Sequence, residues 1–117
     1  MNAADLPATL GEELKRRRYF MRMDILDQTA SLVKLRLYIT PDLFVQIYRN
    51  DRYQTTNLVL IHNNQRLYAR DELDGHWHRH THLAPEEHDT SEEGQRAVEV
   101  SEFLDEVEKV LAMLDLP

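Results

Sequence analysis

Hydrophobic residues recur at every second position in several stretches between residues 19 and 82, and this period limits the possible folds more than any other feature. A period of two is typical of a strand with one face buried and the other face against solvent. Asparagine, aspartate, glycine and proline interrupt the alternation at short intervals, and short turns join antiparallel neighbours. The pattern therefore predicts an antiparallel β-meander of five to six strands over residues 19–82.

Three signals place turns within this sheet. Pro41 presets one backbone dihedral and lacks an N–H donor, so the chain turns there. Asn63-Asn64 tolerates the positive φ angles of a two-residue hairpin, and Asp74-Gly75 gives a third turn. We expect a fifth strand over residues 66–70 and a sixth over residues 76–82.

Helical periodicity appears at both ends of the chain. Leu10 and Leu14 share a face four residues apart, which predicts a short helix over residues 8–18. An apolar stripe at helical spacing predicts a helix over residues 101–114, with Ser101 as its N-cap and one face of the sheet beneath it. The expected fold is a single α+β domain over residues 1–117, in which residues 83–100 form an irregular acidic segment.

The chain has no cysteine, which excludes a disulfide framework, thiol catalysis and a cysteine-based zinc site. No apolar run reaches the roughly 20 residues of a membrane helix, and the N-terminus lacks a secretory signal, so we expect a cytoplasmic protein with no membrane partner. Residues 1–80 carry 12 Lys and Arg against 10 Asp and Glu, whereas residues 81–117 carry 2 against 11. The first part could meet RNA, and the acidic tail would repel it.

Histidine occupies every second position of one short segment. These residues are His76, His78, His80 and His82. On a strand they would line one face, with Trp77 and Arg79 on the opposite face. Packing does not require such a row, and histidine is the side chain whose unperturbed pKa lies nearest neutrality. Exposed histidines are often inert, but four in one row make this segment the candidate functional site.

Metal binding is one chemistry that suits the row. Two histidines two residues apart on a strand can face the same ion. His88, Glu86 or Asp89 would then supply a third ligand.

Acid–base catalysis without a metal is the other. One histidine would take a proton and another would give one, while Arg66, Arg70 or Arg79 would steady the charge of a phosphate group. Tyr68, on the neighbouring strand, would donate a proton or stack on a base. These parts suit cleavage of RNA through its own 2′-hydroxyl group.

Four segments of the chain together match a known family: Gln65-Arg66-Leu67-Tyr68-Ala69-Arg70-Asp71, Trp77-His78-Arg79-His80, Pro85-Glu86-Glu87-His88-Asp89 and Phe103-Leu104-Asp105-Glu106-Val107. Through them the chain resembles, from about residue 20 to residue 114, the TumE-type toxins of type II toxin–antitoxin systems. The most specific part is the order Tyr-x-x-Asp, Trp-His-x-His and Pro-Glu-x-His. The residues that match it are Tyr68, Asp71, His78, His80 and His88, whereas His76 and His82 are additional to the pattern.

The resemblance implies a growth-inhibiting toxin that is encoded beside a helix-turn-helix antitoxin and acts on RNA or on translation, for example at the ribosome. We expect a metal-independent endoribonuclease that needs no cofactor. Its expected catalytic residues are Tyr68, His78, His80 and His88, and its expected substrate-binding residues are Arg66, Arg70, Asp71, Trp77 and Arg79. The alternative is a non-catalytic metal-binding or protein-interaction domain built on the same histidine row, and a homo-oligomer is compatible with either. Because phosphate contacts dominate RNA affinity, the modest positive charge of residues 1–80 suggests a small RNA contact or a target presented in another context.

Overall fold

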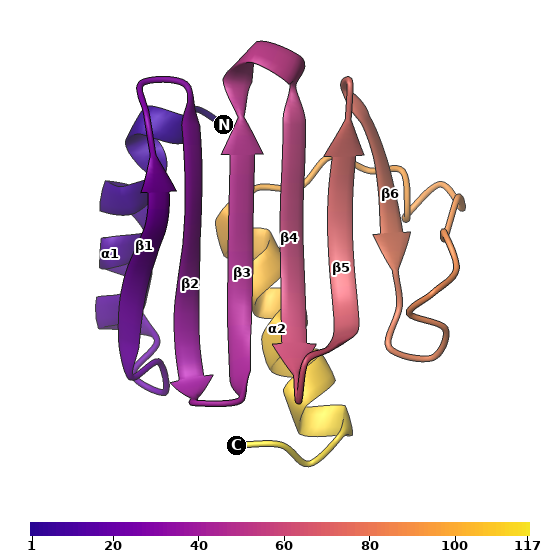
Figure 1. Ribbon diagram of the computed structural model, residues 1–117. Coiled ribbons are helices and arrows are strands. Elements are labelled where there is room, and N and C mark those ends of the chain that lie inside the picture. Colours follow the sequence, from indigo (N-terminus) through magenta and orange to yellow (C-terminus); the bar gives the residue numbers. More distant parts are fainter.

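The computed structural model describes residues 1–117 and shows one six-stranded antiparallel sheet with two α-helices (Figure 1). Strand order in space equals strand order in sequence, so the predicted meander and the α+β class are confirmed. The strands are β1 (Arg22–Gln28), β2 (Leu32–Thr40), β3 (Leu43–Asn50), β4 (Thr55–His62), β5 (Gln65–Leu73) and β6 (His76–His80).

The tight turns form where the sequence predicts them. Asn63 and Asn64 both have positive φ, at 51° and 65°, and they join β4 to β5. Asp74 and Gly75 also have positive φ, at 53° and 83°, and join β5 to β6. Asparagine, aspartate and glycine adopt this region at lower cost than other residues, so these two hairpins fix the register of the last three strands.

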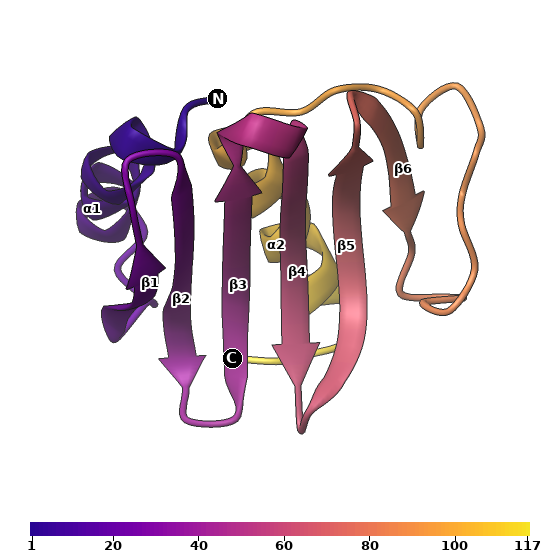
Figure 2. The ribbon, with the colours of Figure 1, turned by 45° about the horizontal axis from the view of Figure 1, so that its top comes forward.

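Both helices lie on the same side of the sheet, with α2 behind the central strands and α1 behind β1 and β2 (Figures 1 and 2). Helix α1 (Leu6–Arg16) begins two residues earlier than predicted, since Pro7 in its first turn presets φ at a position that needs no N–H donor. Helix α2 (Val100–Met113) begins with a capping box between Glu99 and Glu102, so the N-cap is Glu99 and not the predicted Ser101.

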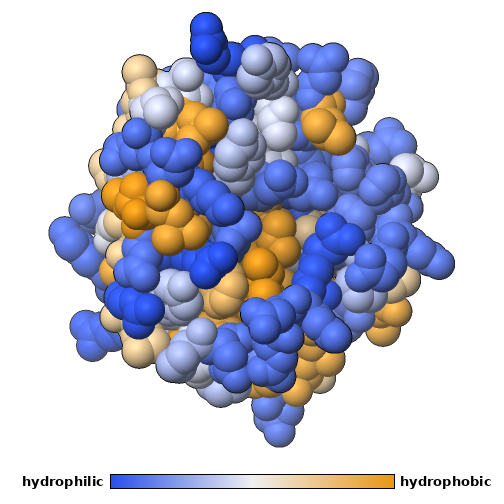
Figure 3. All heavy atoms as spheres, in the orientation of Figure 1, coloured by the Kyte–Doolittle hydropathy of each residue, from blue (hydrophilic) through white to orange (hydrophobic).

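The hydrophobic core lies between the sheet and the two helices. Alternate residues of β2, β3 and β4, together with the apolar stripe of α2, are buried there. The fully buried members include Leu35, Leu37, Val45, Ile47, Leu58, Leu60, Phe103, Leu104 and Val107. Because strand residues alternate, their neighbours lie on the opposite face of the sheet, which no helix covers and which we call the open face. Viewed from this side, the surface is mostly hydrophilic (Figure 3).

The first strand is less buried than its alternation predicts. Met21 and Ile25 are 55% and 45% exposed, although Ile25 pairs with Leu35 and so faces the helix side. Strand β1 is the edge of the sheet, and Phe20, which precedes it, is buried instead. Neither helix is long and apolar enough to cross a membrane.

The basic cluster at residues 16–18 takes part in the packing of the two helices. The Arg17 side chain is 7% exposed and lies 2.7 Å from Glu13 of α1 and 3.0 Å from Asp105 of α2. Arg17 also pairs with Glu108. Arg17 therefore links the two helices, on the side of the sheet opposite to the open face.

Candidate functional site

Strand β6 directs its histidines to the open face. His76, His78 and His80 pair with Leu73, Asp71 and Ala69 of β5, and the alternation expected for the row is present. Strand β6 ends at His80, so His82 leaves the row. His82 instead helps to line a hollow with Tyr68, Arg79 and Lys109 on the helix side.

The segment after β6 returns to the strand and brings a further histidine into the row. Arg79 and Asp89 form an isolated antiparallel bridge, with backbone hydrogen bonds in both directions. Their side chains also pair, with Arg79 Nε 2.7 Å from an Asp89 carboxylate oxygen. Because neighbours of a bridged pair point to the other face, His88 comes to lie beside His80. The Arg79–Asp89 pair therefore positions His88 from the far side of the strand.

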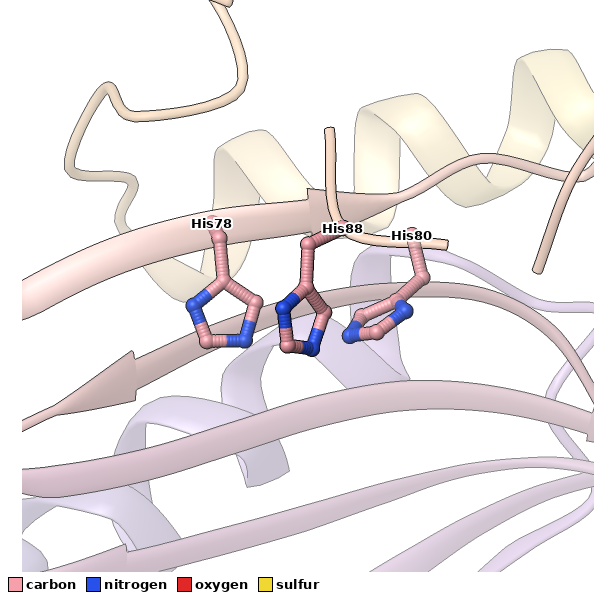
Figure 4. A group of neighbouring side chains, drawn as sticks. All are labelled: His78, His80 and His88. Atoms are coloured by element: carbon pink, nitrogen blue, oxygen red, sulfur yellow. The ribbon is translucent and has the colours of Figure 1, made fainter. Parts of the chain in front are cut away.

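His78, His80 and His88 form a compact cluster (Figure 4). One ring nitrogen from each residue lies within 4.8 Å of those of the other two. The ring of His88 lies between the others, with its centroid 4.3 Å from that of His78 and 4.8 Å from that of His80. The three histidines differ in solvent exposure: His80 is 3% exposed, His78 is half-buried and His88 is exposed.

Asp71 of β5 lies next to the cluster. Its Oδ2 atom is 3.3 Å from His80 Nε2 and 3.6 Å from His78 Nε2. Burial raises the pKa of the Asp71 carboxyl above its ordinary value, and the neighbouring imidazoles, His80 foremost, offset only part of that rise. Burial and the charge of Arg66 lower the pKa of His80, while Asp71 opposes them. Both shifts favour the neutral forms of this pair.

A second contact orients the His80 ring. Its Nδ1 atom lies 3.0 Å from the carbonyl oxygen of Pro85. Because a carbonyl oxygen can accept a hydrogen bond but cannot donate one, Nδ1 carries the proton. In the neutral imidazole, Nε2 then presents its lone pair toward Asp71. Pro85 thus fixes the tautomer of His80 from within the segment that also delivers His88.

Arg66 completes the charged groups at this end of the open face. It pairs with Ile61 of β4 and lies 3.6 Å from Glu86. A register shift in β5 lies between Arg66 and Tyr68, and it places Arg66 on the face of Asp71. The Nε atom of Arg66 is buried and has no hydrogen-bond partner.

Two hollows flank the histidine cluster. One, of about 370 Å³, runs across β2 to β5 and is lined by Lys34, Gln46, Tyr48, Asn57, Val59, Arg66 and Asp71. The other, of about 330 Å³, lies beside β6 and is lined by Gly75, His76, Trp77, His78, His88, Thr90 and Gln95. Both are near the lower end of the size range of small-molecule sites, and hydrogen-bonding side chains dominate both linings.

Four polar residues of the first hollow were not identified from the sequence: Lys34, Gln46, Tyr48 and Asn57. Three of them form a row across the sheet, since Lys34 pairs with Tyr48, Tyr48 with Asn57 and Asn57 with Asp71. In the sequence they are the polar residues that alternate with buried apolar ones in each strand. Only the pairing of the strands shows that they lie next to one another.

Tyr68 and Arg70 lie on the opposite face of the sheet and do not meet the histidines. The Tyr68 hydroxyl donates to Glu106 of α2 at 2.8 Å, and Arg70 donates to both carboxylate oxygens of Glu106 at 2.8 and 3.0 Å. Burial and the bond to Glu106 raise the pKa of Tyr68 to about 12. Arg70 is fully buried, and its ion pairs outweigh burial and raise its pKa. Both residues tie the sheet to α2.

The remaining predicted residues, Trp77 and Arg79, also point to the helix side. Trp77 packs partly buried against the core, and Arg79 is engaged with Asp89. Of the residues predicted for the site, the structure therefore brings together His78, His80, His88, Asp71 and Arg66. It separates Tyr68, Arg70, Arg79 and Trp77 from them.

Comparison of the chain with protein-family models, with curated proteins and with solved structures finds no match to any of the three. The geometry of the histidine cluster is therefore the main evidence for a function.

Proposed function

We propose that the chain is an RNA-cleaving toxin of a toxin–antitoxin pair and that the histidine cluster on the open face is its catalytic centre. The main support for the proposal is that residues of the toxin motif from separate segments lie close together. Asp71, His78, His80 and His88, four of the five residues that match the toxin motif, come from β5, β6 and the following loop and lie side by side. The fifth, Tyr68, has a structural role on the other face.

The differences in exposure among the three histidines support distinct roles for them. His88 is exposed and has no carboxylate partner within ion-pair distance, so it is the general base that takes the proton from the 2′-hydroxyl. The 2′-oxygen attacks phosphorus, and the bond from phosphorus to the 5′-oxygen breaks. His78, half-buried beside His88 and 3.6 Å from Asp71, gives its proton to that 5′-oxygen. The products are a 2′,3′-cyclic phosphate and a 5′-hydroxyl group.

His80 and Asp71 are positioning residues in this scheme. His80 is too buried to reach a substrate, but it is held by Pro85 and packs between Asp71 and His88. Arg66, on the same face, stabilises the negative charge that develops on the phosphate oxygens.

The two hollows match an RNA chain that crosses the cluster. A cleaved phosphate has a nucleotide on each side, and one hollow lies on each side of the histidines. Tyr48 offers a ring for stacking, and Gln46 and Asn57 offer amides for base edges.

The charges of the open face fit this substrate better than the net charge of −7 suggests. Its cations are Arg22, Lys34, Arg36 and Arg66, and its carboxylates are Asp24, Asp27 and Asp71, together with Glu86, which pairs with Arg66. Most of the acidic excess belongs to residues 81–117, of which α2 lies behind the sheet (Figure 1). An RNA on the open face therefore avoids the acidic helix, which is left free for a basic partner such as the antitoxin.

Induced expression tests the biological role. Wild type and His82→Ala, a control outside the cluster, are expected to arrest growth, whereas His78→Ala and His88→Ala at equal folded levels do not. If wild type does not arrest growth, or if both cluster variants arrest it equally well, the proposal is wrong.

A substrate with an activated leaving group tests the two roles separately. The p-nitrophenyl ester of a 3′-nucleotide has a leaving group that needs no proton, so the general acid becomes dispensable. His78→Ala is expected to keep its activity on this ester while losing activity on RNA, and His88→Ala is expected to lose both. The reverse pattern would exchange the roles.

A further inference from the structure

We infer that Asp71, His78, His80 and His88 also form a binding site for one divalent transition-metal ion, with Zn²⁺ as the best fit. The site goes beyond the proposed cleavage reaction. It uses Asp71, on β5, as a ligand in place of the predicted Glu86 or Asp89. Asp89 is excluded because it points to the helix side and pairs with Arg79.

The spacing of the donor atoms is the first support. A tetrahedral ion with bonds of about 2.0–2.1 Å has ligands about 3.3–3.4 Å apart. Asp71 Oδ2 lies 3.3 Å from His80 Nε2 and 3.6 Å from His78 Nε2. His88, on a loop and exposed, lies within 4.8 Å of the other imidazole nitrogens, and its ring would move closer to them to complete the site.

The hydrogen bonds are the second support. His80 donates from Nδ1 to the Pro85 carbonyl, which leaves its Nε2 lone pair directed at a carboxylate oxygen. Two acceptors that face each other at this distance need a proton or a cation between them. The other oxygen of Asp71 is buried and has no hydrogen-bond partner. A backbone carbonyl that holds the second nitrogen of a ligating histidine is also the usual outer contact of a zinc site.

The donor set selects the kind of ion. Three imidazoles and one carboxylate suit Zn²⁺, Ni²⁺ or Cu²⁺, whereas Mg²⁺ and Ca²⁺ require mainly oxygen ligands. Arg66 lies close enough to Asp71 for its positive charge to act on that carboxylate, so it opposes a bound cation, and the affinity for the ion is expected to rise when the charge of Arg66 is removed.

Metal binding has a regulatory consequence, which rests on the proposed function. The ion would occupy the ring nitrogens with which His88 takes a proton and His78 gives one. Zinc would therefore inhibit RNA cleavage, and a chelator would restore it.

The test is a titration of tag-free, chelator-treated full-length protein with Zn²⁺ by calorimetry and with Co²⁺ by visible absorption. We expect one ion per chain and the intense absorption of four-coordinate Co²⁺. Affinity is expected to fall at least about 10-fold in His78→Ala, His88→Ala and Asp71→Asn, to stay unchanged in the control His82→Ala and to rise in Arg66→Gln.

Several results would overturn the site: no binding at 100-fold molar excess of Zn²⁺, more than one equivalent with equal affinity, or unchanged affinity in the cluster variants. The readout is independent of RNA cleavage. A protein that binds zinc through these residues but does not cleave RNA would refute the proposed function and leave the metal site standing.

Discussion

Removal of the Glu106 carboxylate is expected to destabilise the protein strongly, because Arg70 is fully buried beneath it. Glu106 accepts two hydrogen bonds from Arg70 and one from Tyr68. In Glu106→Ala the guanidinium keeps only Glu93, whose side chain is 51% exposed. Loss of one partner of a buried ion pair costs about 3–5 kcal/mol. That is a large part of the roughly 5–15 kcal/mol by which a domain is stable.

The assay is urea denaturation followed by the fluorescence of the single tryptophan, Trp77, and by circular dichroism. Lys109→Ala, an exposed change on the same helix, is expected to stay within about 0.5 kcal/mol of wild type. The apolar double variant Arg70→Met/Glu106→Leu is expected to be more stable than Glu106→Ala, because no charge is left buried without a partner. A loss below about 1 kcal/mol in Glu106→Ala would refute this account of how the sheet is joined to α2.

Three further substitutions test Tyr68, the turn at Gly94 and the ion pairs of Glu93. Tyr68→Phe is expected to lower the free energy of unfolding by about 1 kcal/mol in urea denaturation and still to arrest growth, because the hydroxyl donates a hydrogen bond to Glu106 and not to a substrate. Loss of growth arrest in a folded variant would show that Tyr68 takes part in the reaction. Gly94→Ala is expected to abolish zinc binding while the sheet stays folded. The added Cβ would lie 2.1 Å from the Asp89 carbonyl oxygen and would displace the segment that holds His88. A zinc affinity equal to that of wild type in calorimetry would contradict this. Glu93→Gln is expected to lessen the loss of stability between pH 4.5 and pH 2. Hydrogen bonds from Arg96 and Arg70 hold the pKa of Glu93 at about 2 in the folded protein, so between pH 4.5 and pH 2 the unfolded chain binds more protons and the protein becomes less stable as the pH decreases. If wild type and Glu93→Gln show the same pH dependence in denaturation, these contacts do not act in solution.

The strand pattern and the turn residues were enough to predict the sheet. Alternation in β2 to β4 identifies the buried face, and Asn63-Asn64 and Asp74-Gly75 fix two hairpins through their positive φ angles. The exposed first strand could not be predicted, since Ile25 has the same alternation as a buried strand and only its edge position leaves it uncovered.

The composition of the site could be predicted only in part. Strict alternation places Arg66, Tyr68 and Arg70 on one face, but the register shift in β5 turns Arg66 to the open face and leaves Tyr68 and Arg70 with α2. A bulge of one residue has no clear sequence signal here, so the sorting of these side chains required the structure. The arrival of His88 likewise depends on the bridge between Arg79 and Asp89, a contact across a loop.

The most direct test of the histidine centre is the reaction of purified protein, with chelator present, on a defined single-stranded RNA, followed by identification of the new ends. If the cluster is the catalytic centre, wild type and His82→Ala leave 2′,3′-cyclic phosphate and 5′-hydroxyl ends, and His78→Ala and His88→Ala do not cleave the RNA. Cleavage by His78→Ala and His88→Ala at the wild-type rate, or no cleavage by wild type, would contradict the claim that this cluster is a catalytic centre for RNA.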